Sequence, residues 1–287
     1  MSYVIITDTG CDIKPDVLES WGVRALSLSF RFVDEDREYT ESDMPISEFY
    51  AAMRAGRVAK TAAVNSESFK LEFEQYLKEG MDVLYLGFSS GLSSTYNAGR
   101  MAAESLRESY PERRILTVDS KCASAGQGLL VYLTYVKKNE GATLEEAHAY
   151  AETMAPKISH WFTVDDLVYL KRGGRVSPAA AFFGNLIGIK PVLHVDDEGK
   201  LIPILKVRGR RTSITTIADK YGESAEDPSG GTVFISQADC MADAELLAAE
   251  LNKRYGASVQ IITDVGAVIG SHSGPGTLAL FFVAKER

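Results

Sequence analysis

Cysteine is scarce in this 287-residue chain and follows no regular spacing. The three cysteines, Cys11, Cys122 and Cys240, lie far apart in the sequence, and none belongs to a CxxC pair. Such an odd and scattered set excludes the disulfide framework of a small secreted domain and a cysteine-based zinc site. The cysteine pattern therefore favours a reducing compartment.

Long hydrophobic runs are missing as well. No stretch reaches the roughly 18 apolar residues that a membrane-spanning helix requires. The first residues, MSYVIITDTGCDIKP, become polar too early for the apolar region of a secretory signal. We therefore expect a cytoplasmic protein.

Excess positive charge and the common nucleotide-binding motifs are also absent. The formal net charge is -8, whereas nucleic-acid-binding domains usually present a basic face. Neither GxGxxG nor a phosphate loop ending in GK[ST] occurs in the chain. Asp8 and Asp12 lie close in sequence, but no cluster of histidine, cysteine and carboxylate residues surrounds them. We expect no nucleic-acid partner, no metal site and no cofactor.

The first half of the chain does contain an alternation of strand and helix patterns. Short apolar runs predict strands, and apolar residues at helical spacing predict the helices between them, with Asp12 as the cap of the first helix. Such alternation is typical of a mostly parallel sheet with helices on both faces. We assign residues 1–157 to a Rossmann-like α/β domain. Its predicted strands are 4–8, 25–33, 83–88 and 115–120, and its predicted helices are 12–21, 46–56, 66–80, 94–109 and 143–154.

Beyond Pro156 the pattern changes to strands separated mainly by turns. Residues 158–287 are therefore predicted to form a second, α+β domain with fewer helices. Its predicted strands are 159–164, 190–196, 201–207, 233–238, 259–265 and 278–284, and its predicted helices are 212–221 and 242–255.

The stretch VLYLGFSSGLSSTYNAGR, residues 83–100, carries a serine-glycine loop between a strand and a helix. Residues 91–95, GLSST, almost match the GxSxG nucleophile elbow, but Thr95 replaces its second glycine. Backbone N–H groups at a helix start would suit an anionic oxygen ligand, and Ser93 or Ser94 could instead serve only as a helix cap. The loop alone leaves these alternatives open.

His272 has the most unusual setting of the four histidines, because it precedes a Ser-Gly-Pro-Gly turn between two strands where we expect exposure. His160 and His194 fall within strand patterns and His148 within a helix, where structural roles are expected. A serine loop paired with His272 could form either a hydrolase pair or a carboxyl-binding pair.

Two glycine-broken basic loops and one apolar segment complete the candidates. The loops hint at a phosphate group or an acidic partner; they contain Lys171, Arg172, Arg175, Lys206, Arg208, Arg210 and Arg211. Between them lies SPAAAFFGNLIGI, residues 177–189, which is too short to span a bilayer. It could be a buried core helix or the wall of an apolar cavity.

Six ordered motifs together resemble the DegV family of bacterial fatty-acid-binding proteins. They are TDTGCDI, KTAAVNSESF, FSSGLSSTYNAG, VDSKCASAGQG, YLKRGGRVS and GSHSGPGTLALFF. The resemblance covers essentially the whole chain. It implies two α/β-type domains with a long-chain fatty acid between them. It also implies a non-catalytic lipid-binding subunit that presents the fatty acid to a separate ATP-dependent kinase, for acyl-phosphate formation and phospholipid synthesis. Transient contact with a membrane surface is compatible with that role.

The resemblance also implies roles for individual residues. The carboxyl group would be held by Thr61, Ser93 and His272, with neighbouring contacts from Ala62, Ala63, Ser94 and Ser273. Arg175 and Arg208 match basic loops where a kinase or phosphate could dock. The apolar tunnel would be lined by Phe182, Phe183, Leu186 and Ile187.

One motif departs from the family. Thr61 is followed by Ala62, Ala63, Val64 and Asn65 where the family usually has a Ser-Gln-Pro-Ser run. This departure bears on acyl selectivity and on head-group geometry. The alternatives to a lipid carrier are a serine hydrolase or acyltransferase that uses Ser93 and His272, and an interaction protein with an empty cleft.

Overall fold

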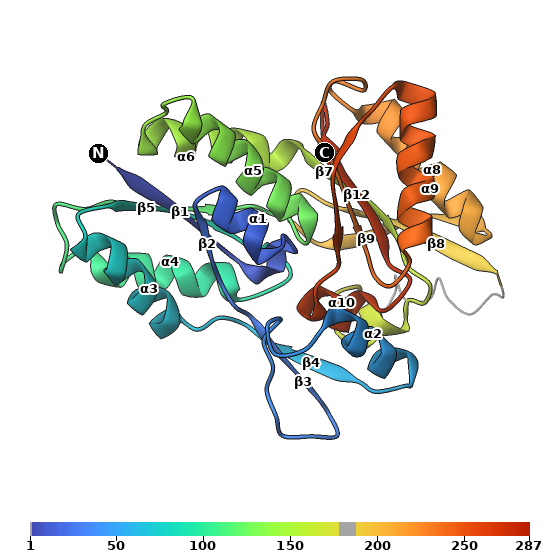
Figure 1. The fold of residues 1–287 in the computed structure, drawn as a ribbon, viewed down its shortest axis with the longest axis horizontal. Coiled ribbons are helices and arrows are strands. Elements are labelled where there is room, and N and C mark those ends of the chain that lie inside the picture. Colours follow the sequence, from blue (N-terminus) through green and yellow to red (C-terminus); the bar gives the residue numbers. More distant parts are fainter. Residues whose placement is uncertain (1, 178–187) are drawn as a thin grey trace.

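The computed structural model describes residues 2–177 and 188–287. A four-stranded parallel sheet forms the centre of the first half of the chain (Figure 1). β1 and β5 are buried at every residue, as expected for strands covered on both faces. In order across the sheet, the strands are β2 (Val23–Leu26), β1 (Tyr3–Asp8), β5 (Asp82–Gly87) and β6 (Ile115–Asp119).

Helices pack on both faces of this parallel sheet, so the predicted Rossmann-like α/β architecture is confirmed. One face is covered by α1 (Pro15–Ser20), α5 (Ala125–Asn139) and α6 (Leu144–Met154), and the other by α3 (Ser66–Lys78) and α4 (Thr95–Leu106). Local signals set several helix starts. Asn65 Oδ1 accepts a hydrogen bond from Ser68 N at 2.8 Å, and Thr143 and Glu146 form a reciprocal capping box.

The predicted single strand 25–33 is wrong, because the chain changes sheets within it. After β2 ends, Leu28 N donates to Thr9 Oγ1 (3.0 Å), and β3 (Ser29–Phe32) then pairs antiparallel with β4 (Ala59–Ala62). α2 (Ile46–Arg54) joins the two strands of this hairpin. The hairpin packs away from the parallel sheet, in a cluster that contains Phe30, Phe32, Phe49, Val265 and Ala267.

The predicted helix cap at Asp12 is also wrong. Asp12 ends a short 3₁₀ turn, η1 (Thr9–Cys11), in the left-handed region with φ 51°. α1 begins only at Pro15, which suits the first turn of a helix because its fixed φ is already helical.

A six-stranded mixed sheet forms the second half of the chain, as predicted for an α+β region. β10 and β11 are parallel, and the other neighbours are antiparallel. α8 (Arg210–Ser224) and α9 (Met241–Tyr255) cover one face. In order, the strands are β11 (Val259–Asp264), β10 (Val233–Gln237), β12 (Leu278–Val283), β7 (Ile158–Thr163), β8 (Ile189–Val195) and β9 (Leu201–Arg208).

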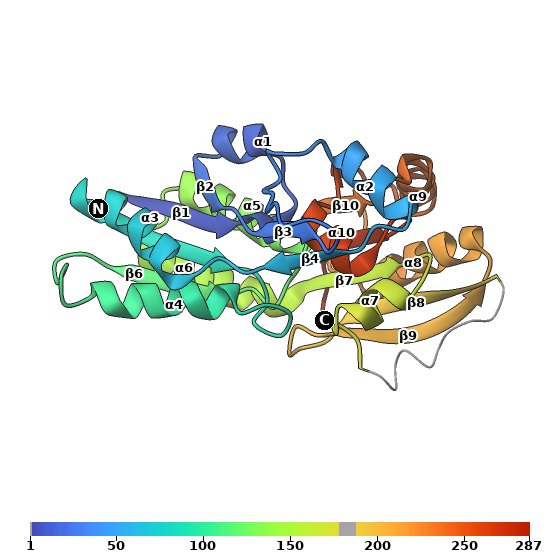
Figure 2. The same cartoon turned by 90° about the horizontal axis from the view of Figure 1, so that it is seen from below.

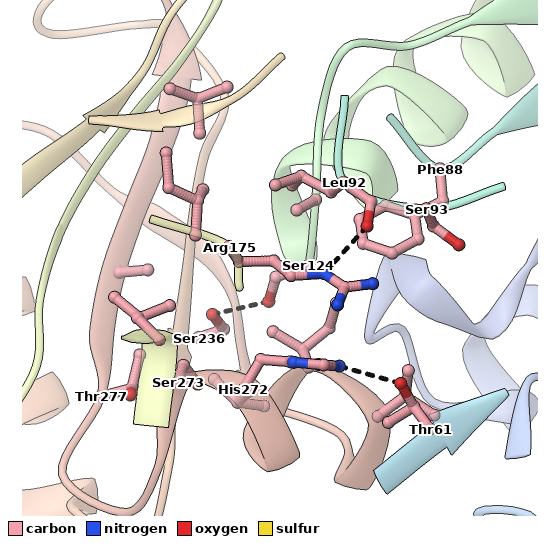
Figure 3. A pocket seen from close by; sticks show the side chains of 18 of the residues that line it. Thr61, Phe88, Leu92, Ser93, Ser124, Arg175, Ser236, His272, Ser273 and Thr277 are labelled. Carbon is pink, nitrogen blue, oxygen red and sulfur yellow. Dashed lines mark hydrogen bonds between the residues drawn. The ribbon is translucent and has the colours of Figure 1, made fainter. Parts of the chain in front are cut away.

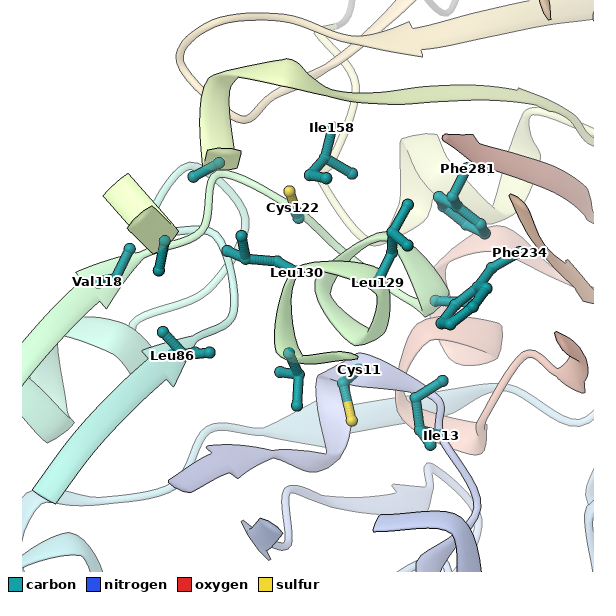
Figure 4. Packing of buried hydrophobic residues seen from close by; sticks show 14 of the residues in the cluster. Cys11, Ile13, Leu86, Val118, Cys122, Leu129, Leu130, Ile158, Phe234 and Phe281 are labelled. Atoms are coloured by element: carbon teal, nitrogen blue, oxygen red, sulfur yellow. The ribbon is translucent and has the colours of Figure 1, made fainter. Parts of the chain in front are cut away.

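α5 packs against both sheets. The sequence pattern of residues 125–139 does not predict this helix. Leu129 and Leu130 lie between Leu86 of the parallel sheet and Phe281 of the mixed sheet (Figure 4). A Cβ at Gly126 would lie 2.2 Å from His160 Nε2, and one at Gly128 would lie 2.4 Å from Ile13. Glycine is unfavourable inside a helix, but here it permits close approach of neighbouring elements.

Two short helices and a turn complete the described chain. η2 (Ala155–Lys157) leads into β7, α7 (Val168–Arg172) follows β7, and α10 (Ala267–Ser273) precedes β12. α10 lies beside the β3–β4 hairpin, as Figure 2 shows from below. Within the described ranges, no helix has the length and hydropathy of a membrane span.

Candidate functional site

A cavity of about 240 Å³, partly open to solvent, lies between the two halves of the chain. Its wall combines residues from the parallel sheet's loops, the β3–β4 hairpin, the mixed sheet and α10 (Figure 3). Ligand sites of α/β proteins commonly lie beyond the carboxyl ends of parallel strands. The cavity has a polar end near Thr61, Ser93, Arg175 and His272, and a mainly apolar remainder.

Asp8 positions the serine-glycine loop. This fully buried side chain accepts hydrogen bonds from Phe88 N (3.0 Å), Gly10 N (3.1 Å), Tyr85 Oη (2.9 Å) and Gln127 Nε2 (3.2 Å). Burial raises the pKa of Asp8, and these four donors oppose that rise. The carboxyl end of β1 thereby holds the start of the loop that follows β5.

The serines of this loop divide into structural and cavity-lining groups. Ser89 Oγ donates to Gly199 O (2.9 Å), and Ser90 Oγ accepts from Lys121 Nζ (2.9 Å), so both tie the loop to its neighbours. Ser93 and Ser94 line the cavity. Ser93 Oγ also accepts from Thr95 N at 3.2 Å, whereas Ser94 makes no side-chain cap. Ser93 is therefore both a helix-start residue and part of the cavity wall.

His272 lies at the end of α10 rather than in an exposed turn, so the expected exposure is wrong. The segment 267–273 forms two turns of helix because Gly274 N donates back to Gly270 O, and Gly274 then ends the helix with φ 80°. His272 is half-buried and lines the cavity, with its Nε2 2.8 Å from Thr61 Oγ1 (Figure 3). Thr61 lies on β4. The contact therefore joins the β3–β4 hairpin to α10 across 211 positions of the sequence.

Two polar atoms beside this contact have unused hydrogen-bonding capacity. His272 Nδ1 and Ser273 Oγ are buried, and no hydrogen-bond partner for either occurs in the described part of the chain. Burial and the nearby Arg175 charge lower the pKa of His272 to about 4. The imidazole is therefore neutral near pH 7, and the formal positive charge at this end comes from Arg175.

Arg175 lies inside the site, whereas Arg208 does not. Arg175 lines the cavity, where its Nε donates to Leu92 O (3.0 Å) and its Nη1 donates to Gly173 O (2.6 Å). Burial lowers the pKa of Arg175, but a guanidinium remains charged near neutral pH. Arg208 is exposed at the end of β9, outside the described lining.

Other basic residues of the two loops are engaged in ion pairs on the surface. Arg210 Nε lies 2.8 Å from Asp243 Oδ2, and Lys190 beside this loop lies 2.6 Å from Asp165 Oδ1. Some of the basic side chains in this region are thus paired with carboxylates of the chain and need no phosphate or acidic partner.

Ala62 and Ala63 also reach the cavity, as the sequence suggested. Both are exposed on their outer side, where they border a shallow polar groove with Ser27, Thr40 and Asn65. The two alanines thus form a thin part of the wall. The tunnel residues named from the family, Phe182, Phe183, Leu186 and Ile187, lie outside the described residues.

Sequence reasoning missed most of the apolar wall and one polar part of it. The apolar residues are contributed by loops and strand ends, among them Leu28, Phe88, Phe162, Val268, Ile269 and Phe281. Ser124 and Ser236 line the cavity as well, and their hydroxyls are 2.9 Å apart. The VDSKCASAGQG motif that contains Ser124 was the available signal, although no side chain in it stood out.

Backbone groups hold both His160 and His194, as expected for structural histidines, but His160 also lines the cavity. Nδ1 of His160 is 3.0 Å from Ile158 O, and its Nε2 accepts from Ala123 N (3.3 Å). His194 Nδ1 is 2.7 Å from His160 O, and its ring stacks on Trp161. Burial lowers the pKa of both imidazoles.

The geometry does not arrange Ser93 and His272 as a nucleophile and its base. Over the described residues, the hydroxyl of Ser93 pairs with Thr95 Oγ1 (2.9 Å) and His272 Nε2 pairs with Thr61. A serine hydrolase requires the serine and histidine to be within hydrogen-bond reach. No group of three or more His, Cys, Asp or Glu side chains suited to a metal ion occurs within residues 2–177 and 188–287.

Comparisons with known proteins agree with this architecture. A family model described as the uncharacterised DegV family matches residues 2–285. A DegV domain-containing protein of Clostridium perfringens is 39% identical over 99% of this chain and 98% of its own length. A fatty acid-binding protein of Thermotoga maritima is 33% identical over 100% of this chain and 99% of its own.

A solved structure of a similar protein has the same fold. A DegV family protein from Thermus thermophilus, described by its fatty acid binding, superposes with a TM-score of 0.89 at 28% identity, over 99% of this chain and 100% of that one. Similarity that spans both halves of the chain covers the cavity between them as well. This chain belongs to the DegV family.

Proposed function

We propose that this protein binds a long-chain fatty acid in the cavity between its two halves and presents its carboxyl group to a separate kinase. The observation that carries the proposal is the polarity of the cavity. The hydroxyl, imidazole and guanidinium groups of Thr61, Ser93, His272 and Arg175 line it, and most of the other lining residues are apolar, apart from a second polar group that includes Ser124 and Ser236. Relatives described as fatty-acid-binding proteins support the choice of ligand.

The head-group contacts follow from the hydrogen-bonding capacity of the polar end. A buried carboxylate accepts hydrogen bonds and must be met by donors, because an unpaired buried charge is costly. If Thr61 donates its hydroxyl hydrogen to the carboxylate, its oxygen must accept the bond at 2.8 Å from His272 Nε2. That arrangement requires the neutral His272 tautomer with hydrogen on Nε2. Ser93, Ser94 and Ser273 supply further hydroxyls, and Arg175 supplies the countercharge.

The acyl chain occupies the apolar remainder of the cavity, between residues such as Phe88, Phe162 and Phe281. Burial of an acyl chain contributes about 0.8 kcal/mol per CH₂ before entropic costs. Of the four residues that replace the family's Ser-Gln-Pro-Ser run, Ala62 and Ala63 line the cavity. They make this part of the wall less polar, and we infer that the change affects which acyl chains are accepted.

The protein itself performs no chemical step in this proposal and needs no cofactor. The partner kinase supplies ATP, a carboxylate oxygen attacks the γ-phosphorus, and ADP leaves as the acyl phosphate forms. The exposed Arg208, outside the cavity on β9, is a candidate contact for that kinase. The acyl phosphate would then serve phospholipid synthesis in the cytoplasm, where a transient contact with the membrane surface could deliver it.

The decisive experiment is to purify the chain under mild conditions, denature it, and identify the released small molecule by mass spectrometry. We expect a long-chain fatty acid in near one-to-one amount. A chain that carries no fatty acid and does not bind added fatty acid would refute the proposal. Stoichiometric labelling of Ser93 by a fluorophosphonate would instead favour the hydrolase alternative.

A further inference from the structure

Two carboxyl side chains converge at the start of α10. An alanine Cβ in place of Gly266 would lie 2.1 Å from Glu41 Oε1 and 2.7 Å from Asp12 Oδ1, so both oxygens face the same point. Both atoms are buried, and neither has a hydrogen-bond partner among the residues that the structure describes. Asp12 as a whole is buried, whereas Glu41 is partly exposed and only its inner oxygen is enclosed.

The other oxygen of Asp12 connects this pair to the cavity. Ser124 Oγ donates to Asp12 Oδ2, and the same hydroxyl lies 2.9 Å from Ser236 Oγ. Ser124 and Ser236 both line the cavity (Figure 3). Ser124 has φ 54° and ψ -149°, a conformation that non-glycine residues rarely adopt, and its N–H is held by Gly10 O at 2.8 Å.

The pair is also connected to the head-group end, through α10. Gly266 is the N-cap of this helix, and His272 and Ser273 are its last residues. Glu41 comes from the segment between β3 and α2, which packs against the start of the same helix. A change in the distance between Asp12 and Glu41 would therefore move both a cavity wall residue and the helix that carries His272.

We propose that Asp12 and Glu41 share one proton, and that this proton makes them a positioning pair for α10 and for the Ser124 wall of the cavity. A proton on either carboxyl turns that group into a donor to the other, so a single O–H···O⁻ bond satisfies both unpartnered oxygens. The predicted effect on ligand affinity rests on the proposed function. The shared proton itself does not depend on fatty-acid binding.

The surrounding charges favour proton sharing. The groups that act on Asp12 are Glu41, Asp264 of β11, the hydroxyl of Ser124 and the backbone N–H of Gly266, and no cation stands among these influences in the described part of the chain. Asp12 and Glu41 in turn raise the pKa of Cys11 and of Tyr50. Burial and the Glu41 charge raise the pKa of Asp12 well above its usual range, and burial raises the pKa of Glu41 to about 7. Two buried carboxyl groups that face the same point beside Gly266 cannot both ionise without mutual repulsion.

The pH dependence follows from these directions. A carboxyl whose pKa is raised in the folded state binds its proton more tightly there than in the unfolded chain. The folded state is therefore favoured at low pH, and it loses this advantage as the pH rises from about 4.5 to about 7. Loss of the Glu41 proton above about pH 7 adds a negative charge to the pair, and the cavity becomes less favourable to a carboxylate ligand.

The test measures fatty-acid affinity between pH 6 and pH 8.5 for the wild-type chain and for Glu41→Gln, Glu41→Ala and Glu48→Gln. The wild type should lose affinity by about ten-fold over this range, the factor that corresponds to one pKa unit of coupling. Glutamine keeps a donor toward Asp12 without the charge, so E41Q should retain the affinity measured at pH 6 over the whole range. E41A should bind weakly at every pH, and E48Q, an exposed change on α2, should follow the wild type.

A second measurement separates this proposal from the proposed function. The melting temperature of the ligand-free wild type should fall from pH 5 to pH 7 more steeply than that of E41Q, whether or not fatty acid binds. Carboxyl ¹³C NMR on the wild type, which needs no variant, should show one carboxyl that titrates near pH 7. Parallel melting profiles, or an NMR titration in which both groups lose their protons below pH 5, would overturn the shared proton.

Discussion

Two polar clusters border the cavity, and they offer a ligand different chemistry. The head-group cluster presents donors and one positive charge; it consists of Thr61, Ser93, Arg175 and His272. The carboxyl cluster presents hydroxyls backed by acids; it consists of Ser124 and Ser236 on the wall with Asp12 and Glu41 behind them. One cluster attracts an anion, whereas the other repels it.

The two clusters together can orient an amphipathic anion in the cavity. Apolar surface binds the acyl chain without directional preference, because the hydrophobic effect depends mainly on buried area. Electrostatic complementarity then decides which end receives the carboxylate. A fatty acid should therefore place its head at Arg175 and avoid the wall at Ser124.

The largest expected effect is on stability, because the two clusters should respond to pH with opposite sign. The pKa of His272 falls to about 4, so the unfolded chain binds this proton more readily and the free energy of unfolding rises between about pH 4 and 6.5. The raised pKa of Glu41 gives a fall between about pH 4.5 and 7. Each contribution is at most about 3 kcal/mol.

Urea unfolding across this pH range separates the two contributions, because His272→Gln removes the first and Glu41→Gln the second. Relative to the wild type, the two difference curves should slope in opposite directions. Difference curves that slope in the same direction would contradict the opposite pH responses expected of the two clusters.

A smaller effect is expected on affinity when the positive charge of the head-group cluster is removed. Arg175→Met should weaken fatty-acid binding by roughly 30-fold, about 2 kcal/mol, because a charge-assisted hydrogen bond to the carboxylate is lost. Isothermal titration measures this change, and binding should also lose most of its salt dependence.

Arg208→Met is the matched control for that variant, since Arg208 is an exposed arginine outside the cavity. Its fatty-acid affinity should equal that of the wild type, whereas phosphorylation by a partner kinase should slow. Equal loss of affinity in both variants would show that Arg175 acts through general charge rather than through the site.

The smallest expected effect concerns a single neutral donor. Thr61→Val keeps the shape of the side chain but removes the hydroxyl that faces His272 Nε2. We expect a loss of about 1 kcal/mol, roughly five-fold in affinity, because one neutral hydrogen bond is lost. Thr61→Ser, which keeps the hydroxyl, should bind within experimental error of the wild type; a five-fold loss there too would assign the effect to packing.

Local patterns in the sequence were sufficient for most regular elements. The strands β1, β5 and β6 follow from short apolar runs, and α6 follows from its capping box at Thr143 and Glu146. α5 did not follow from its pattern, because Gly126 and Gly128 are poor helix formers whose value depends on the strands packed against them. The break between β2 and β3 depends likewise on a distant contact, from Leu28 N to Thr9.

Some features of the candidate site could likewise be predicted from the sequence, and others could not. Thr61, Ser93 and His272 could be proposed together only through the resemblance of whole motifs, since no spacing relates residues 61, 93 and 272. The burial of His272 was missed because the segment 267–273 is short and composed of small residues, so its helical pattern is weak. The sequence predicts Asp12 as a helix cap, because nothing in it indicates that Glu41 lies nearby.

The order of residues was thus enough to determine most strands and helices, the serine-glycine loop and the family, but not the β3–β4 hairpin. These features depend on local preferences and on motifs that are contiguous in the chain. Tertiary packing alone decided that a cavity forms, that Arg175 lines it, and that Asp12 and Glu41 face the same point beside Gly266. Burial and proximity arise only when segments distant in sequence meet, and it is burial that shifts the pKa of a histidine down and of a carboxyl up.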